Sequence, residues 1–432
     1  MRRPALLAVA LLAASVATAS VAVAQTTTTT TTTTPTTTPA STSTTLPAAP
    51  ITRTTISVGG FVADGPSYAG AEIGAQARLV RANLRGVGGR KIFYVGTETD
   101  HGDVAALAAT RARLFPTVAA VVPSASPNLL TSNASPGPPS FGPADTELWN
   151  ATRLAFGFAG VQKPSPSGRL ASPAWGITMR ALLGTARAKT VVVAGGPLTM
   201  DQAQLARASL RAAGFTVPLA VVVEPGTDPA ANATALAQQG PDGVVLLADP
   251  LVTAAVASAL SARSYTGTVA TSAEFYRPEN PAIAAGLTVL LPYAPPEQAT
   301  PANKALLADV ERFAPGTKVT AGVVAGYWAA DEFVAALTKA GKGASAAKLA
   351  KTLRSFTYEV KGTVGPTTFP GAHTQPSPCG ALVQSDGTVY LPTVTYRCGT
   401  PVKVKIPTPA PTPTPSTLPT AAAATPTTTT KK

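Results

Sequence analysis

The stretch ISVGGFVADGPSYAGAEIGAQARLVRANLRGVGGRKIFYV, residues 56–95, decides the fold of this chain. It opens with an apolar run of strand length, which ends at the turn signal Asp64-Gly65-Pro66. Apolar residues at helical spacing follow from near Tyr68, and a second apolar run closes the stretch. This order of strand, helix and strand with short connections predicts parallel strands covered by a helix.

The same alternation continues along the chain. A helix over 104–114 and a strand over 118–122 extend the first unit. The pattern restarts near residue 190, where strand-like and helix-like segments alternate as far as residue 291. Two doubly wound parallel sheets, an α/β fold, are therefore expected. A later helix over 326–340 has apolar residues at 3-4-3-4 spacing, and we expect its aromatic side chains in the core rather than at a ligand.

Charge and motifs argue against several classes of protein. The net charge is +13, but residues 51–402 hold 28 basic and 21 acidic side chains with no run of either sign, which indicates no nucleic-acid surface. The glycine-rich turn over 86–89 lies between a helix and a strand, the wrong order for a phosphate-binding turn. His101 and His373 sit in polar loops without metal-ligand spacing, and there is no Gly-x-Ser-x-Gly motif. The sequence predicts a protein that is not an enzyme and needs no cofactor or metal.

Both ends of the chain differ in composition from the rest. Residues 1–24 have a positive start and an apolar run, typical of an export signal cleaved near Ala24; an uncleaved membrane anchor is the alternative. Thr- and Pro-rich segments at 25–50 and 403–432 are expected to be disordered. They are spacers that hold the folded part away from a wall or membrane, or tails with no specific task. The protein is therefore expected outside the cytoplasm, secreted or associated with the cell wall.

The two cysteines, Cys379 and Cys398, flank a predicted hairpin. Strand-like segments over 381–384 and 388–396 enclose a turn at 385–387. A hairpin brings its two ends together, and an exported protein meets an oxidising compartment. We therefore expect a structural disulfide, contributing about 3 kcal/mol for a loop of this length. Two free thiols are the alternative.

Four stretches spread over nearly all of 51–400 carry a likeness to one known family. They are RANLRGVGGRKIFYV at 81–95, PPSFGPADTELWNATRLAFGF at 138–158, GYWAADEFVAALTKAG at 326–341 and KGTVGPTTF at 361–369. In their order and spacing the chain resembles the type I periplasmic solute-binding proteins, in the leucine/isoleucine/valine-binding branch that serves ABC importers.

The resemblance implies two lobes that are joined by three crossings and close on a small molecule. Lobe one would hold residues 51–172 and 296–357, and lobe two residues 173–295 and 358–402. In such a fold the ligand binds at the carboxyl ends of the strands, facing the cleft. Ligand binding then shifts the population towards the closed state.

The resemblance also points to ligand-binding residues. Ser124 and Ser126, in a strand-to-helix turn, match the family's loop for a ligand carboxylate, and the alternative is that they only cap the helix. Glu274 follows a short strand where the family places an acid for the ligand's ammonium, and the alternative is a solvated glutamate. The remaining candidates are Tyr276, which would stack on the ligand, and Asp249, Gly142, Pro143 and Tyr68.

Two departures from the family concern the ligand. The loop over 195–198 lacks an aromatic residue that the family often has there, and Asp145 could repel a carboxylate. The resemblance therefore supports the family's fold for this chain more strongly than it supports the family's amino-acid specificity. The expected function is capture of a small polar ligand, an amino acid or related metabolite, for an ABC importer. The alternative is a wall-associated structural or sensory protein that keeps the fold with a changed or lost ligand.

Overall fold

The computed structural model describes residues 50–163, 170–218, 220–238 and 240–404. The predicted export signal, the predicted linker up to residue 49 and the predicted tail from residue 405 lie outside the described residues. Within the described ranges, no helix has the length and apolar character that a membrane span requires.

The first sheet is entirely parallel and has the strand order β2-β1-β3-β4-β5. The chain moves outward from β1 in both directions, which is the doubly wound pattern predicted from the sequence. The strands β1 and β3 are almost wholly buried, because helices cover this sheet. The strands are β1 (Thr55–Val62), β2 (Lys91–Glu98), β3 (Ala120–Ala125), β4 (Ser140–Gly142) and β5 (Ala155–Gly157).

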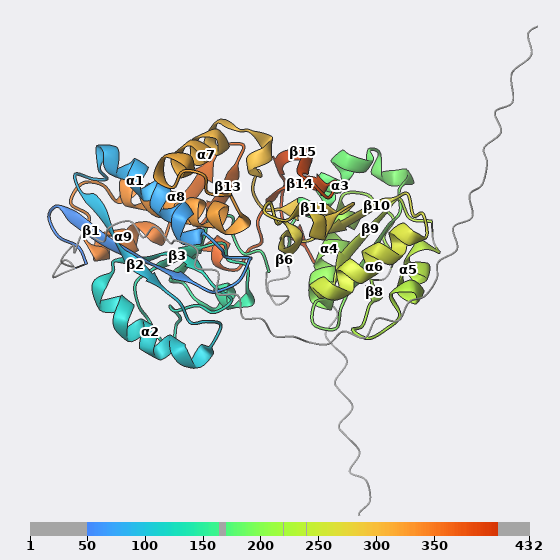
Figure 1. Ribbon diagram of the computed structural model, residues 1–432, viewed down its shortest axis with the longest axis horizontal. Coiled ribbons are helices and arrows are strands. Elements are labelled where there is room, and N and C mark those ends of the chain that lie inside the picture. The colour runs from blue at the N-terminus through green and yellow to red at the C-terminus, as the bar shows by residue number, and fades with distance from the viewer. Residues whose placement is uncertain (1–49, 164–169, 219, 239, 405–432) are drawn as a thin grey trace, which may run out of the picture. The chain divides into compact units, whose positions relative to one another are not determined.

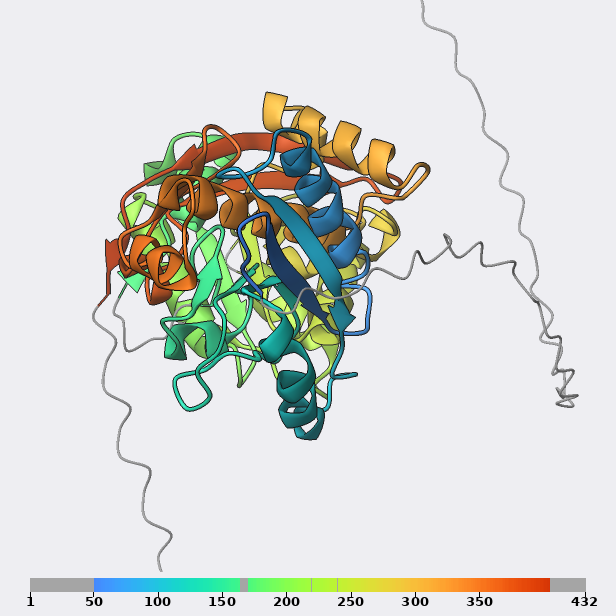
Figure 2. The same ribbon diagram turned by 90° about the vertical axis from the view of Figure 1, so that its left-hand side faces the viewer.

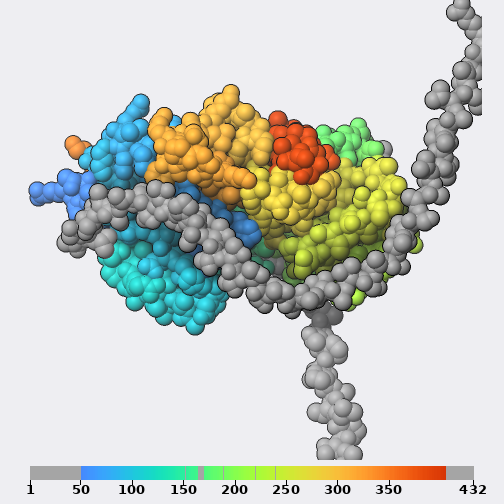
Figure 3. Space-filling view, in the orientation of Figure 1, coloured from blue at the N-terminus to red at the C-terminus, as the bar shows by residue number. Residues whose placement is uncertain are grey.

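Within the described ranges, five helices accompany the first sheet, and three of them come from late in the sequence. Figure 1 shows the late helices, in orange, among the blue and cyan elements of the first sheet. Figure 2 shows α1 in blue beside α7 in orange, and the space-filling view of Figure 3 shows the same neighbours at the surface. The helices are α1 (Ala71–Arg85), α2 (Leu107–Leu114), α7 (Pro301–Phe313), α8 (Ala321–Ala340) and α9 (Ala346–Leu353).

The helices α1 and α8 approach each other closely because each has a glycine that faces the backbone of the other helix. A Cβ atom at Gly326 would overlap the carbonyl group of Ala71, and one at Gly74 would overlap the carbonyl group of Val323. Most of α8 is buried as a result, and the side chains of Tyr327 and Trp328 lie in the core as expected.

The second sheet has the order β15-β14-β11-β10-β9-β7-β8. Its five strands from β11 to β8 are parallel to one another, and β14 and β15 add an antiparallel edge. The strands are β7 (Val191–Gly195), β8 (Val221–Val222), β9 (Gly243–Leu247), β10 (Thr268–Thr271), β11 (Thr288–Leu291), β14 (Cys379–Ser385) and β15 (Tyr390–Cys398). The helices that follow these parallel strands or lead into them are α3 (Ala174–Leu183), α4 (Met200–Ala212), α5 (Pro229–Ala237) and α6 (Pro250–Ala262).

In the part of the chain that the structure describes, the elements alternate between the two groups three times: after β5, after β11 and before β14. The strands β12 (Thr357–Val360) and β13 (Val364–Thr368) pair with each other, and the Tyr358 hydroxyl donates to Asp331 on α8 at 2.8 Å. A short strand, β16 (Val402–Lys403), pairs with β6 (Leu170–Ala171), so the first residue of the predicted tail lies in a strand. The lobe boundaries given above stay a prediction.

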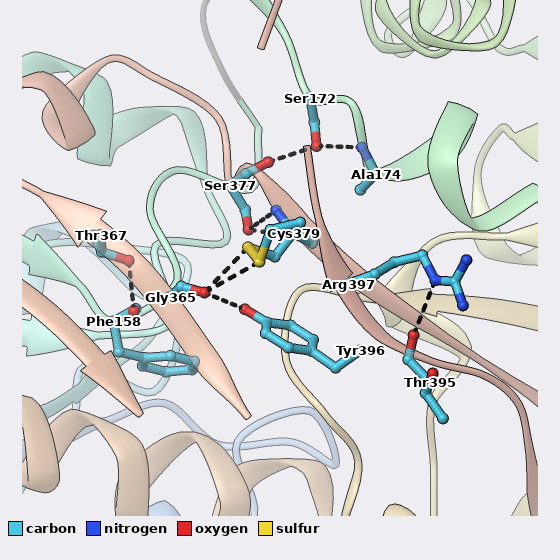
Figure 4. The surroundings of a disulfide bond; sticks show 11 residues. Phe158, Ser172, Ala174, Gly365, Thr367, Ser377, Cys379, Thr395, Tyr396 and Arg397 are labelled. Carbon is cyan, nitrogen blue, oxygen red and sulfur yellow. Dashed lines mark hydrogen bonds between the residues drawn. A yellow bond between two sulfur atoms is a disulfide. The ribbon is translucent and has the colours of Figure 1, made fainter. Parts of the chain in front are cut away.

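Cys379 and Cys398 form a disulfide between directly opposed residues of β14 and β15 (Figure 4). This is the pairing expected from the sequence. The Cys379 sulfur lies 3.1 Å from the Gly365 carbonyl oxygen, which also accepts a hydrogen bond from the Tyr396 hydroxyl at 2.9 Å. The disulfide therefore sits where the last crossing enters the second sheet.

Candidate functional site: a cavity between the two sheets

A cavity of about 160 Å³ lies where both groups of elements meet. Asp145 and Lys163 come from loops of the first group, and Thr199, Ala248 and Glu274 come from the second. Four of these residues follow the carboxyl ends of parallel strands: Asp145 follows β4, Thr199 follows β7, Ala248 follows β9 and Glu274 follows β10. Ligands of open parallel sheets bind at this end of the strands, so the position is that of a ligand site.

Asp145 is the acidic group most affected by burial in this cavity. Burial raises the pKa of its carboxyl group to about 6, although a hydrogen bond from Tyr68 and the charge of Lys163 oppose the rise. Its Oδ1 atom is buried and has no hydrogen-bond partner among the described residues. A buried carboxylate oxygen without a donor is costly, and it marks a place where a ligand group can supply one.

Tyr68, another of the predicted ligand residues, lies beside Asp145. Burial raises the pKa of the Tyr68 hydroxyl well above its usual value, and the nearby Asp145 raises it further. The phenol therefore stays protonated and can donate to the carboxylate. Tyr68 is half-buried at the start of the segment that leads into α1.

Among the described residues, one ion pair joins the two groups of elements at the cavity, and a second polar contact joins them outside its wall. The Lys163 ammonium lies 2.8 Å from the Glu274 carboxylate, and each side chain is 42% exposed. The Arg277 guanidinium donates to the Ser67 hydroxyl at 2.6 Å. An ion pair as exposed as Lys163–Glu274 contributes only about 0–1 kcal/mol, so it can break when the two groups separate.

Trp175 is a cavity residue that the sequence analysis missed. It stands in the first turn of α3 and is 8% exposed. The loop over 195–198 lacks the aromatic residue that the resemblance led us to look for there. Trp175 on α3 instead places an aromatic ring on the cavity wall. Gln162, Lys163 and Gln202 line the same cavity and were also missed. Nothing in the local sequence distinguishes these polar residues from surface ones.

Of the predicted ligand residues, Glu274 lines the cavity and Tyr68 adjoins it through Asp145. The Pro143 carbonyl oxygen accepts a hydrogen bond at 2.7 Å from the Gln162 amide, which itself lines the cavity. These three residues, Glu274, Tyr68 and Pro143, are the candidates that the fold brings to the site.

Ser124 and Ser126 lie at the right end of β3 but are covered. Ser124 is 1% exposed, and its hydroxyl has no partner among the described residues. The Ser126 hydroxyl donates to Asp100 Oδ2 at 3.3 Å and accepts from the Asn128 backbone N–H at 3.1 Å. The expected strand-to-helix turn is wrong, because β3 leads through a loop without a helix to β4, so these serines do not cap a helix either.

Three other candidates lie away from the cavity wall. Tyr276 is fully buried against Tyr390, and its hydroxyl donates to Glu297 at 2.8 Å, so no face is left for stacking on a ligand. The Asp249 carboxylate is exposed and caps α6 by accepting from the Leu251 N–H at 2.9 Å. A Cβ atom at Gly142 would overlap the backbone of Ser124, so this glycine serves packing.

In the described structure neither histidine belongs to a group of side chains that could hold a metal. His101 pairs with Asp64 at 2.6 Å on the surface. His373 is buried against Phe156 and Phe369, and burial lowers its pKa. Among the described residues, no three His, Cys, Asp or Glu side chains are grouped so that they could hold a metal.

A larger cavity, of about 1270 Å³, lies at the opposite end of the first sheet. Its walls include Val118, Pro139 and Leu154, which precede β3, β4 and β5, together with residues of α9. It is on the amino ends of the strands, and no described residue of the second sheet lines it. The smaller cavity is therefore the candidate site, because it has the position and the converging polar groups of a ligand site.

Two doubly wound sheets with three crossings and a cavity between their carboxyl ends define a two-lobed solute-binding protein. The chain belongs to the periplasmic binding protein family, whose model matches residues 55–388. Family membership means a solute-binding role and a place outside the cytoplasm. None of the curated proteins compared with the chain matches it.

Solved structures with the same fold are distant in sequence. The fatty acid ABC transporter substrate-binding protein from Thermomonospora curvata is 18% identical with a TM-score of 0.57, covering 82% of this chain and 94% of that one. A putative branched-chain amino acid ABC transporter from Rhodospirillum rubrum is 17% identical with a TM-score of 0.56, covering 78% and 99%. An ABC transporter solute-binding protein from R. palustris in complex with benzoate is 13% identical with a TM-score of 0.53, covering 81% and 99%. At these identities the likeness shows the fold.

Proposed function

We propose that the protein captures a small polar solute, an amino acid or a related metabolite, in the cavity between its lobes and delivers it to an ABC importer. The observation that carries the proposal is the convergence of Asp145, Lys163, Glu274 and Trp175 on one cavity at the carboxyl ends of both sheets. The similar structures are named for fatty acids and branched-chain amino acids or hold benzoate, so the ligand class has to come from this chain's own residues.

The geometry supports binding by closure of the two groups of elements. Asp145 and Lys163 stand on one side of the cavity and Trp175 and Glu274 on the other, so a ligand would contact both sides at once. A ligand that contacts both sides favours the closed state over the open one. The exposed ion pair between Lys163 and Glu274 adds little to closure without ligand, so the ligand decides the equilibrium.

The first experiment is a thermal-shift screen of the full chain against amino acids, amines, small amides and carboxylic acids. A ligand that binds only the folded state raises the melting temperature, by an amount equivalent to about 2.7 kcal/mol at one hundred times its Kd. A shift confined to one chemical class would support the proposal and identify that class. No shift with any compound would count against solute capture.

The Thr- and Pro-rich composition of 25–50 and 403–432 favours a second candidate, a wall-associated structural or sensory protein with the same fold. Such extended segments suit a spacer through a cell wall. Fractionation of cells separates the two functions. A sensory or structural protein would stay with the wall and bind no importer permease, whereas a transport protein would be cross-linked to one.

A further inference from the structure

Among the described residues, the charges around the cavity leave the Asp145 carboxylate without a counter-ion of its own. Lys163 and Glu274 neutralise each other at 2.8 Å, and the Arg277 guanidinium, which donates to the uncharged Ser67 hydroxyl, is not among the charges that act on Asp145. The charged neighbours that act on Asp145 are Lys163, which lowers its pKa, and Glu274, which raises it, after the larger effect of burial. Because these two neighbours have opposite signs, they offset each other at Asp145.

The Asp145 carboxylate also lacks donors. The Tyr68 hydroxyl lies beside it, and Oδ1 has no partner in the described part of the chain. Ionised carboxylates accept several hydrogen bonds, and the strongest come from charged N–H donors. A ligand ammonium or guanidinium would supply both the charge and the donors.

The opposite wall of the cavity suits a cation as well. Trp175 is the aromatic residue of the second group that lines the cavity. An indole ring attracts a cation within about 6 Å of its face, and indole is the best aromatic side chain for this. A carboxylate on one wall and an indole on the other together favour a positively charged nitrogen between them.

We propose that the cavity selects small organic molecules with a cationic nitrogen, and that Asp145 holds this nitrogen. The inference rests on the solute-binding function proposed above. It gives the ammonium-binding role to Asp145, on the first group of elements, rather than to Glu274 on the second. A carboxylate on the ligand is then unnecessary, because Lys163 is already paired and the candidate hydroxyls Ser124 and Ser126 are covered.

The inference predicts a pH dependence of binding. Burial raises the pKa of Asp145 in the free protein to about 6, so the carboxylate is ionised at pH 7 and becomes protonated below pH 6. Only the ionised form attracts a cation. The Kd for a cationic ligand should therefore rise about tenfold between pH 7 and pH 5, because each pH unit below the pKa removes about nine-tenths of the ionised form. The other titratable groups facing Asp145 are Tyr68, Lys163 and Glu274.

The test uses probes that share an apolar body and differ in charge. The set is 3-methylbutylamine, 4-methylpentanoate and leucine, with benzylamine, benzoate and phenylalanine as a second set, measured by calorimetry with the full chain. We expect binding of the amines and amino acids and none of the two carboxylates. Binding of the carboxylates without the amines would overturn the inference while leaving solute binding in place. No binding of any of the six would overturn both.

Two matched variants locate the nitrogen. Asp145→Asn should weaken amine binding at least a hundredfold and abolish the pH dependence, whereas Glu274→Gln should weaken it less than tenfold. The melting temperature of free Asp145→Asn should not fall, because the amide replaces a buried group whose charge is opposed by burial. A larger effect of Glu274→Gln than of Asp145→Asn would return the role to Glu274 and refute the inference.

Discussion

The acidic residue Glu332 is fully buried, and no described group compensates its carboxylate for the hydrogen bonds to water that burial removes. It is fully buried on α8, and neither carboxylate oxygen has a hydrogen-bond partner among the described residues. The Trp328 indole N–H, one turn earlier on the helix, also lacks a partner there. Burial raises the pKa of Glu332 well above its usual value, and the neighbouring Asp331 raises it further. The folded protein therefore holds Glu332 as the neutral acid.

This neutral acid makes stability depend on pH. Because the folded-state pKa is raised, the free energy of unfolding is highest below the unfolded-state pKa of about 4.3 and falls as the pH rises towards the folded-state pKa. The loss from this one group is about 1.4 kcal/mol per pH unit within that window. Glu332→Gln cannot ionise, so urea unfolding between pH 5 and pH 8 should show a shallower decline for the variant.

The matched control is Glu359→Gln, which changes an exposed glutamate on β12. Its pH profile should coincide with that of the unchanged protein. If Glu332→Gln and Glu359→Gln gave the same profile, the buried acid would not be the source of the pH dependence.

Among the elements, the contact between α1 and α8 sets how the first sheet is covered. Gly74 and Gly326 face the backbone of the other helix, so this contact has no room for a side chain. Arg81 on α1 donates to Asp309 on α7 at 3.0 Å, and the Tyr327 hydroxyl of α8 donates to the same Asp309 oxygen at 2.7 Å. One carboxylate thus ties the three helices together.

Gly326→Ala should destabilise the protein strongly, because its methyl group would overlap the Ala71 carbonyl and push the helices apart. Overpacking of this kind costs roughly 3 kcal/mol, which would appear as a lower urea midpoint. Gly196→Ala is the control, since a Cβ atom at Gly196 meets only ordinary contacts of 3.5 Å and more. Equal stability of Gly326→Ala and the unchanged protein would show that the helices can separate without cost.

The order of these elements could be predicted from the sequence, but the residues at which some strands begin and end could not. The turn predicted at 385–387 forms where expected, with Gly387 at a positive φ and Asp386 accepting backbone hydrogen bonds. The Cys379–Cys398 pair followed from that hairpin. In contrast, β8 is only Val221–Val222, because the ends of a strand are set by its pairing, here with β7, rather than by local preference.

At the scale of the whole molecule, the cavity joins segments that are far apart in the chain. Trp175 is the tryptophan at this cavity, while Trp149 and Trp328 lie in the core around the first sheet. Closure on a ligand would change the surroundings of Trp175 and leave the other two indoles as they are.

Ligand binding should therefore change the tryptophan emission of the protein, and Trp175→Phe should remove that change. The measurement is a fluorescence titration with a compound that raises the melting temperature in the thermal-shift screen. Trp149→Phe serves as the control and should keep the response. Loss of the response in Trp149→Phe, with Trp175→Phe unaffected, would place the ligand elsewhere.

The sequence by itself determined the α/β class, the two doubly wound units, the core role of α8 and the cysteine pair. Each of these depends on local signals: apolar periodicity, turn residues and the ends of one hairpin. Only the tertiary structure decided which polar residues face the cavity. It buried Tyr276 and Ser124, used Asp249 as a helix cap, and brought Asp145, Lys163 and Trp175 to the site. The physical reason is that burial, charge partners and hydrogen-bond partners arise from contacts between segments distant in the chain, which no local pattern records.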